Sequence, residues 1–266
     1  MYMDLLNMKD ITVHYGKEQE ASVKNFNLTL QPGEIIALVG ESGSGKTTIL
    51  RSILGLLPGK GNVEQGDIFF QGTSLLSLDP KQWKDLRGTE ISMIFQDSGA
   101  MINPIRTIGD QFVEYIRTHK KVGKKEAWKK GADMLSKMHL HDAERVMKSY
   151  PFQLSGGMRQ RVGIAMAMTF QPKILLADEP TSALDVTTQA QIVRQFMEIR
   201  DLYHTAIIMV THNIAMAAYM ADQLIVMRNG RITESGKKED VIKNPKSEYT
   251  KNLLACVPDI GGKRYV

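Results

Sequence analysis

The fold of this chain is decided by the stretch Gly40-Glu41-Ser42-Gly43-Ser44-Gly45-Lys46-Thr47, which matches the phosphate-loop pattern G-x-x-x-x-G-K-[ST]. The glycines let successive backbone N–H groups point inward, at the positive end of a following helix. The lysine supplies a mobile charge for the outer phosphates of a nucleotide, and the threonine offers a hydroxyl to Mg²⁺. The alternative is a purely structural role, as a glycine turn before an amphipathic helix.

The flanks of the loop favour phosphate binding over a simple turn. The short apolar run Ile35–Val39 precedes the loop and is typical of a buried strand of a parallel sheet. After the loop, residues 47–57 predict a helix that ends at Pro58-Gly59. A buried strand, the loop and then a helix is the context that the motif requires.

A second apolar strand, Ile174–Ala177, ends in the two carboxylates Asp178 and Glu179. In a phosphate-loop enzyme, the acid at this strand end holds Mg²⁺, and an acid one residue later can polarise the attacking water. Acids at strand ends are also common turn residues. Because a phosphate loop lies upstream, we interpret Asp178 and Glu179 as catalytic residues rather than turn residues.

Apolar periodicity predicts an α/β fold in which helices cover both faces of a parallel sheet. The first 35 residues alternate as strands do, and residues 105–150 show a helical period instead. Helix and strand then alternate. We expect helices at 157–170, 187–202 and 214–220, strands at 174–178, 206–211 and 223–228, and a helical stretch after about 237.

Composition excludes several classes of protein. The single cysteine, Cys256, excludes an internal disulfide framework and any multi-cysteine metal site within this chain. No secretion signal and no apolar run of about 20 residues is recognisable, so we expect a cytoplasmic location and a separate membrane-spanning partner. The net charge is +5, and the densest basic run, Lys120 to Lys130, is either a solvated helix face or a surface for lipid headgroups or a partner.

A third motif resembles a known family. Leu154-Ser155-Gly156-Gly157-Met158-Arg159-Gln160-Arg161 resembles the signature of ABC ATPases, usually written LSGGQ. Further along the same family's pattern, Gln96 resembles the Q-loop glutamine, Ser182-Ala183-Leu184-Asp185 the D-loop and His212 the switch histidine, while Tyr15 is a candidate stacking platform for adenine.

The resemblance implies a P-loop NTPase with a RecA-like core, an N-terminal antiparallel β subdomain and an inserted helical subdomain. We expect the nucleotide-binding domain at 1–240, the insertion at about 97–154 and a tail at 241–266. The resemblance also implies the cofactors ATP and Mg²⁺.

Roles follow from the resemblance residue by residue. Glu179 would be the general base, His212 would contact the γ-phosphate, and Gln96 would bind Mg²⁺ and the attacking water. The metal ligands would be Thr47, Gln96 and Asp178. The nucleotide-binding residues would be Tyr15, Gly40, Glu41, Ser42, Gly43, Ser44, Gly45, Lys46, Thr47, Thr48 and Asp185. Ser155, Gly156 and Gly157 would act on the nucleotide held by an opposite subunit.

Other details resemble the branch that serves oligopeptide, dipeptide and nickel importers. Met158 replaces the usual glutamine of the signature, and the stretches 93–97 and 102–109 resemble that branch after the Q-loop. The tail resembles its C-terminal motif, although Ser247-Glu248 stands where His-Pro is common. The cargo stays open among peptides, nickel and metal chelates, with a slight lean to the metals because the chain is compact.

Two other functions would also use a phosphate loop. ABC-type ATPases that act on nucleic acid carry a long coiled coil or zinc-binding cysteines between loop and signature, and Lys46 to Ser155 holds neither. A scaffold without turnover would not need Lys46, Asp178, Glu179 and His212 together. We therefore predict an ATPase subunit on the cytoplasmic face of the membrane, with no nucleic-acid partner. Its partners would be two permeases, a second ATPase subunit (a heterodimer favoured over a homodimer) and, indirectly, a solute-binding protein.

Overall fold

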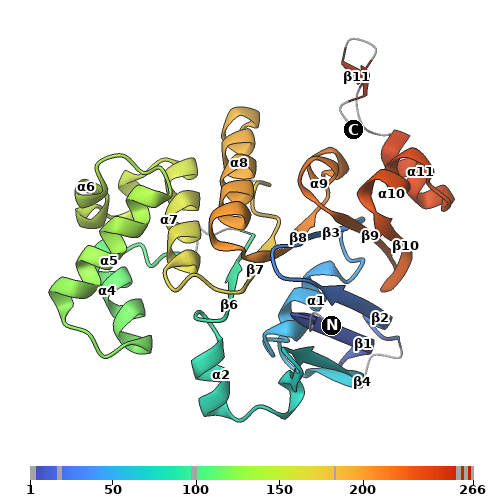
Figure 1. The fold of residues 1–266 in the computed structure, drawn as a ribbon, viewed down its shortest axis with the longest axis horizontal. Helices are drawn as coiled ribbons and strands as arrows, with labels where there is room; N and C mark the ends of the chain where they lie inside the picture. The colour runs from blue at the N-terminus through green and yellow to red at the C-terminus, as the bar shows by residue number, and fades with distance from the viewer. Residues whose placement is uncertain are drawn as a thin grey trace. The chain divides into compact units, whose positions relative to one another are not determined.

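The structure is a computed structural model that describes residues 4–16, 20–96, 101–182 and 184–255, together with the backbone of two short strands, β11 (Asp259–Ile260) and β12 (Lys263–Arg264). The chain divides into two compact units (Figure 1). The first unit comprises Met1–Pro80 and Ala206–Val266, and the second comprises Lys81–Thr205. Each unit is described by itself.

An antiparallel sheet in the order β2-β1-β4-β5 forms one part of the first unit. Its strands are β1 (Leu6–Tyr15), β2 (Val23–Leu30), β4 (Gly61–Phe70) and β5 (Thr73–Ser74). In β2, Phe26, Leu28 and Leu30 are buried while the residues between them are exposed. Alternation of this kind places one face of the sheet on the core.

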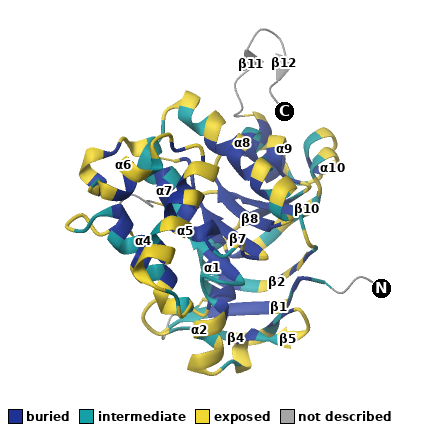
Figure 2. Ribbon diagram, turned by 60° about the vertical axis from the view of Figure 1, so that its left-hand side comes forward, coloured by how far each residue is buried: buried dark blue, intermediate teal, exposed yellow. Residues whose placement is uncertain are grey.

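The rest of the first unit is built on parallel strands. The strands β3 (Ile35–Val39), β8 (Ala206–Thr211) and β9 (Gln223–Arg228) run parallel with β3 in the middle, and β10 (Arg231–Lys237) joins β9 antiparallel. All residues of β3 and β8 are buried (Figure 2), as expected for strands covered on both faces. The helices of this unit are α1 (Lys46–Ile53), α9 (Ile214–Met220), α10 (Lys238–Lys243) and α11 (Glu248–Ala255), with a 3-10 turn at Leu75–Ser77.

Within its described residues, the second unit contains one parallel strand pair and most of the helical residues of the chain. The strands β6 (Ile91–Ile94) and β7 (Ile174–Asp178) pair along their length. The helices are α2 (Pro80–Leu86), which begins at the boundary of the units, α4 (Ile108–His119), α5 (Lys124–Lys137), α6 (Ala143–Lys148), α7 (Gly156–Met168) and α8 (Val186–Tyr203), with a 3-10 turn at Pro151–Gln153.

One helix end differs from the sequence prediction. The helix after the phosphate loop was expected to reach residue 57, but α1 ends at Ile53. Gly55 adopts φ 59°, its N–H donates to the Ser52 carbonyl, and the Leu56 N–H donates to the Arg51 carbonyl. These two bonds form a Schellman motif, which satisfies the last carbonyls and turns the chain away.

Two elements were not expected from the sequence. Strand β10 follows β9 through Asn229-Gly230, with φ values of 50° and 74°. Two left-handed residues make the tight hairpin turn that Asn-Gly favours. Helix α2 begins with Pro80 at its first position, where a proline suits a helix.

Candidate functional site

The phosphate loop lies between β3 and the N-terminus of α1, as the motif requires. Gly40 has φ 149°, and a Cβ placed there would lie 2.1 Å from the Met227 carbonyl oxygen. Gly45 has φ 97°, and its Cβ would lie 2.8 Å from the Ser22 carbonyl oxygen. Both positions therefore need glycine for backbone shape and for close approach of neighbouring strands. Glu41, Ser42 and Gly43, at the outer turn of the loop, are exposed.

Lys46 is the buried cation of this loop, with 5% of its surface exposed. Its ammonium donates to the carbonyl oxygens of Gly40 (2.8 Å) and Glu41 (2.6 Å) and to the Ser44 hydroxyl (3.1 Å). A buried lysine requires such acceptors, because burial of an unpaired charge is costly. The loop thus holds a positive charge against its own backbone carbonyl oxygens.

Two other predicted residues lie in the same unit as the loop. The Tyr15 hydroxyl is 3.2 Å from the Thr48 hydroxyl, so the end of β1 lies beside the first turn of α1. Thr47 is partly buried in that turn. His212 follows the last residue of β8 directly and is exposed.

The two acids and the predicted Q-loop glutamine lie in the second unit. Asp178 is the last residue of β7 and is 3% exposed, and Glu179 follows it. Gln96, two residues after β6, donates from its amide to the Glu179 carboxylate at 3.2 Å. Glu179 has φ 45°, a left-handed backbone that is uncommon and strained for a residue other than glycine. Strain of this kind gathers at functional sites.

The signature residues form the start of α7. Ser155 is the N-cap, and its hydroxyl accepts the Met158 N–H at 3.3 Å. Gly156 and Gly157 open the helix, and a Cβ on Gly157 would lie 2.8 Å from a methyl carbon of Thr188. The second glycine is therefore needed for the packing of α7 against α8. This helix start leaves backbone N–H groups available to an anion.

Asp185 lies beside the signature residues. It is the N-cap of α8, and its carboxylate accepts from the Thr188 N–H at 3.0 Å and from the Thr188 hydroxyl at 2.7 Å. The hydrogen bonds from Thr188 hold the pKa of this carboxyl below its usual range. A pocket of about 350 Å³ is lined by Ser155, Gly156, Gly157, Met158, Arg161, Leu184, Asp185, Thr188 and Gln191. Ala183 of the predicted D-loop lies outside the described residues, as do Asp97 after the Q-loop and Cys256.

The structure thus brings the predicted residues together in three groups. Tyr15 joins the phosphate loop through Thr48, Gln96 joins Glu179, and the signature residues join Asp185. The sequence missed the surroundings of the loop, where the Gly230 N–H donates to the Ser44 carbonyl. The Asn-Gly pair directly after the apolar strand β9 was the available signal for that hairpin.

Among the described residues, no three or more histidine, cysteine, aspartate or glutamate side chains form a group that could hold a metal ion. The carboxylate of Asp178 and the hydroxyl of Thr47 are oxygen donors of the kind that Mg²⁺ prefers. No described helix is both long enough and apolar enough to cross a bilayer.

Comparison with known proteins identifies relatives over most of the chain. The dipeptide transport ATP-binding protein DppD of Bacillus subtilis (strain 168) is 45% identical over 251 residues, which are 93% of this chain and 75% of the relative. The oligopeptide transport ATP-binding protein OppD of Escherichia coli (strain K12) is 42% identical over 256 residues, 96% of this chain and 76% of the relative.

The fold has solved relatives as well. A dimeric ATP-binding cassette, solved in a post-hydrolysis state with ADP and Pi, matches with a TM-score of 0.77 at 28% identity. The match covers 88% of this chain and 98% of that one. The family model described as "ABC transporter" matches residues 23–182, more than half of the chain. The chain belongs to the ABC transporter family, as one of its ATP-binding and ATP-hydrolysing subunits.

Proposed function

We propose that this subunit drives the uptake of short peptides, dipeptides or oligopeptides, into the cell. The relatives at 40–45% identity are named for dipeptide and oligopeptide transport, which favours peptides over the nickel or metal chelates also considered from the sequence. The nucleotide-binding domain would be residues 1–240, with the helical insertion at about 97–154 and the tail at 241–266. Residues 97–100 and part of the tail lie outside the described residues.

The observation that carries the ATPase function is the phosphate loop with its buried lysine. Lys46 is already paired with oxygen acceptors of the loop, and the β- and γ-phosphates of ATP would replace them. The loop N–H groups from Ser42 to Thr48 would bind phosphate, and Tyr15 would stack on adenine. Mg²⁺ would be held by Thr47, Gln96 and Asp178 together with phosphate oxygens.

Glu179 would take the proton of the attacking water, with His212 at the γ-phosphate. The Gln96 amide that donates to Glu179 would set the direction of that carboxylate. The pocket lined by Ser155, Gly156, Gly157 and Asp185 would receive the nucleotide of a second ATPase subunit, because its helix start suits an anion. A heterodimer is favoured over a homodimer.

The region around the start of α4 would receive a membrane subunit. Ile105 is 83% exposed, and Phe152, 72% exposed, is stacked on Tyr150. The Ile108 N–H donates to the Ser149 carbonyl, so the segments that carry these apolar side chains lie side by side. Exposed apolar side chains close together mark interaction sites.

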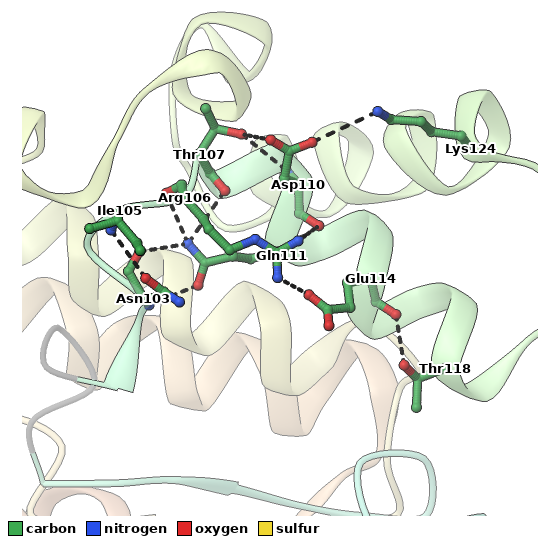
Figure 3. Close-up of polar contacts among 9 residues, drawn as sticks. All are labelled: Asn103, Ile105, Arg106, Thr107, Asp110, Gln111, Glu114, Thr118 and Lys124. Atoms are coloured by element: carbon green, nitrogen blue, oxygen red, sulfur yellow. Dashed lines mark hydrogen bonds and ion pairs between the residues drawn. The ribbon is translucent and has the colours of Figure 1, made fainter.

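The segment before α4 is well ordered for such a role. Figure 3 shows that the Gln111 amide bonds the backbone of Asn103, Arg106 and Thr107, while Thr107 caps α4 through the Asp110 N–H. Arg106 also pairs with Glu114. These contacts would hold Ile105 in a fixed position, where it could contact a cytoplasmic helix of the permease. Docking there would hold the subunit at the cytoplasmic face of the membrane.

A pair of variants tests the nucleotide site. Lys46→Ala should abolish measurable binding of Mg-ATP, because the loop loses its buried cation. Glu179→Gln should keep binding and lose turnover by about 10²–10⁴-fold, the usual cost of removing a general base. Wild-type affinity in Lys46→Ala, or turnover above about a tenth of normal in Glu179→Gln, would contradict these roles.

An uptake assay tests the cargo. Cells in which this chain carries Glu179→Gln should fail to accumulate a labelled dipeptide and a labelled oligopeptide, with ⁶³Ni²⁺ uptake as the comparison. Loss of nickel uptake with normal peptide uptake would reassign the transporter to metal. Crosslinking from Ile105 that captures only proteins without membrane spans would overturn the docking proposal.

A further inference from the structure

A tyrosine of the last helix holds the phosphate loop from outside. The backbone N–H of Glu41, the second residue of the loop, donates to the Tyr249 hydroxyl at 3.0 Å. Tyr249 lies in the first turn of α11 and is 8% exposed. The two residues are 208 positions apart in the chain, yet both belong to the first unit.

The ring of Tyr249 is itself fixed in place. The Arg228 guanidinium lies 4.9 Å from the ring centroid, an arrangement that attracts a cation to the ring face. Arg228 ends β9, and two residues later Gly230 donates its N–H to the Ser44 carbonyl at 3.2 Å. The corner between β9 and β10 therefore contacts both the tyrosine and the loop.

The start of α11 is anchored to β10. The Glu234 carboxylate accepts the N–H groups of Lys246 (2.8 Å) and Ser247 (3.0 Å). The Ser247 hydroxyl then accepts the N–H of Tyr249 at 3.2 Å. Because these backbone N–H groups are hydrogen-bonded, the start of α11 is fixed to β10. The position of the Tyr249 hydroxyl is therefore set by the sheet rather than by the phosphate loop.

The backbone of Glu41 is held on both sides of its Cα, through its N–H and through its carbonyl. Tyr249 accepts from its N–H, and Lys46 donates to its carbonyl at 2.6 Å. If Lys46 turns to the phosphates of a nucleotide, the carbonyl loses that donor. The contact to Tyr249 does not depend on the lysine and can persist.

We propose that Tyr249 is a positioning residue of the phosphate loop, holding its entrance in the shape that receives nucleotide. The proposal rests on the nucleotide binding by this loop proposed above. Tyr249 acts through Glu41 and needs no contact with the nucleotide. A loop that is already ordered loses less conformational entropy on binding, so its affinity is higher.

Tyr249→Phe tests this, because it removes the hydroxyl and keeps the ring beneath Arg228. The expected result is an affinity for Mg-ADP, measured by isothermal titration calorimetry, about three- to tenfold weaker than wild type, the usual effect of one hydrogen bond. The matched control is Tyr219→Phe, on an exposed tyrosine of α9, which should bind as wild type does. Circular dichroism should show the same fold in all three proteins.

Amide hydrogen exchange in the nucleotide-free protein supplies a readout independent of binding. The Glu41 amide should exchange about three- to tenfold faster in Tyr249→Phe. The Ile35 amide, which donates to Asp222, should be unchanged. Unchanged Glu41 exchange and unchanged Mg-ADP affinity would overturn the role of Tyr249. A wild-type protein that does not bind Mg-ADP would instead overturn the proposed nucleotide site, while faster Glu41 exchange would still support the hold on the loop.

Discussion

Glu179 combines a catalytic type of side chain with an unfavourable backbone. Its φ of 45° costs an L-residue about 1–2 kcal/mol, whereas glycine adopts such an angle freely. We therefore expect Glu179→Gly to be more stable than Glu179→Ala by about 1 kcal/mol, after allowing for the greater freedom of glycine in the unfolded chain. Urea unfolding without nucleotide measures this difference. If Glu179→Ala were instead the more stable variant, by the roughly 0.4–1 kcal/mol that alanine usually gains over glycine, the site would store no backbone strain.

Ionisation of Tyr115 should lower the stability of the second unit at alkaline pH. Its hydroxyl donates to the Gly88 carbonyl at 2.8 Å, and burial raises its pKa to about 12 from 10.0. Because the folded-state pKa is above the unfolded one, the stabilisation is fully present below about pH 10 and is lost as pH rises through about 12. Two pKa units correspond to a loss of about 3 kcal/mol. Between pH 9 and 12, the free energy of unfolding should fall less steeply with pH in Tyr115→Phe than in the wild type. The same pH dependence in both proteins would contradict the raised pKa of Tyr115.

At the residue scale, local motifs could be predicted and distant partners could not. Lys46 and Glu179 could be proposed as site residues because their motifs are formed by neighbours in the sequence. The contact of Tyr249 with Glu41 could not be predicted, because the two residues are 208 positions apart. The left-handed backbone of Glu179 was also missed, since nothing in the residue type predicts it.

Among the helices, α4 and α5 pack through glycines. A Cβ on Gly109 would lie 2.3 Å from the ring of Trp128, whose indole N–H donates to Glu144 at 3.1 Å. Alanine usually improves a helix by about 1 kcal/mol over glycine, but here overpacking should reverse the sign. We expect Gly109→Ala to lower stability by about 1–3 kcal/mol.

Thermal unfolding provides the measurement for this packing contact. The matched control is Gly123→Ala before α5, where an added Cβ meets no atom within 4 Å. That variant should change stability much less, by no more than the loss of a weak N-cap. A stabilised Gly109→Ala protein would mean that Trp128 moves aside readily.

Elements with strong periodicity were predicted well, and their ends depended on turn chemistry. The strand at 223–228 and the helix at 214–220 have the expected bounds, because apolar residues fill both. Helix α1 stopped early at a glycine cap, and β10 was missed because its exposed and half-buried residues give no apolar signal. Here hydrogen bonds between backbone groups, rather than hydrophobicity, decide the structure.

For the whole molecule, the order of motifs predicted the family and the fold class, and both predictions are confirmed. The ATPase activity is confirmed at the level of the family. Mg²⁺, the pairing of subunits and the role of each site residue stay predictions. They depend on atoms contributed by other molecules, which the sequence of one chain does not contain.

The proposed sharing of each nucleotide site between two ATPase subunits can be tested in mixed assemblies. Ser155→Arg should fill the pocket beside Asp185 with a long cation. The variant's own binding of Mg-ATP should stay normal, while hydrolysis on the partner's phosphate loop should fall at least tenfold, as for a lost transition-state contact. The two sites can be measured separately in complexes in which one phosphate loop is inactive. Either this chain carries Lys46→Ala or the partner carries the corresponding substitution, and ATP turnover then reports on the remaining site. Loss confined to the variant's own phosphate loop would exclude a shared site.

The hairpin contact with the phosphate loop also bears on how the protein ages chemically. Deamidation of an Asn-Gly pair begins when the glycine nitrogen attacks the asparagine side chain. In Asn229-Gly230 that nitrogen already donates to the Ser44 carbonyl, and the Gly230 carbonyl accepts the Lys24 N–H at 2.8 Å. The pair is therefore tied on both sides while the protein is folded. Unfolding releases the nitrogen, so deamidation of Asn229 should occur mainly in unfolded molecules. The extent of deamidation would therefore report how often the turn between β9 and β10 unfolds.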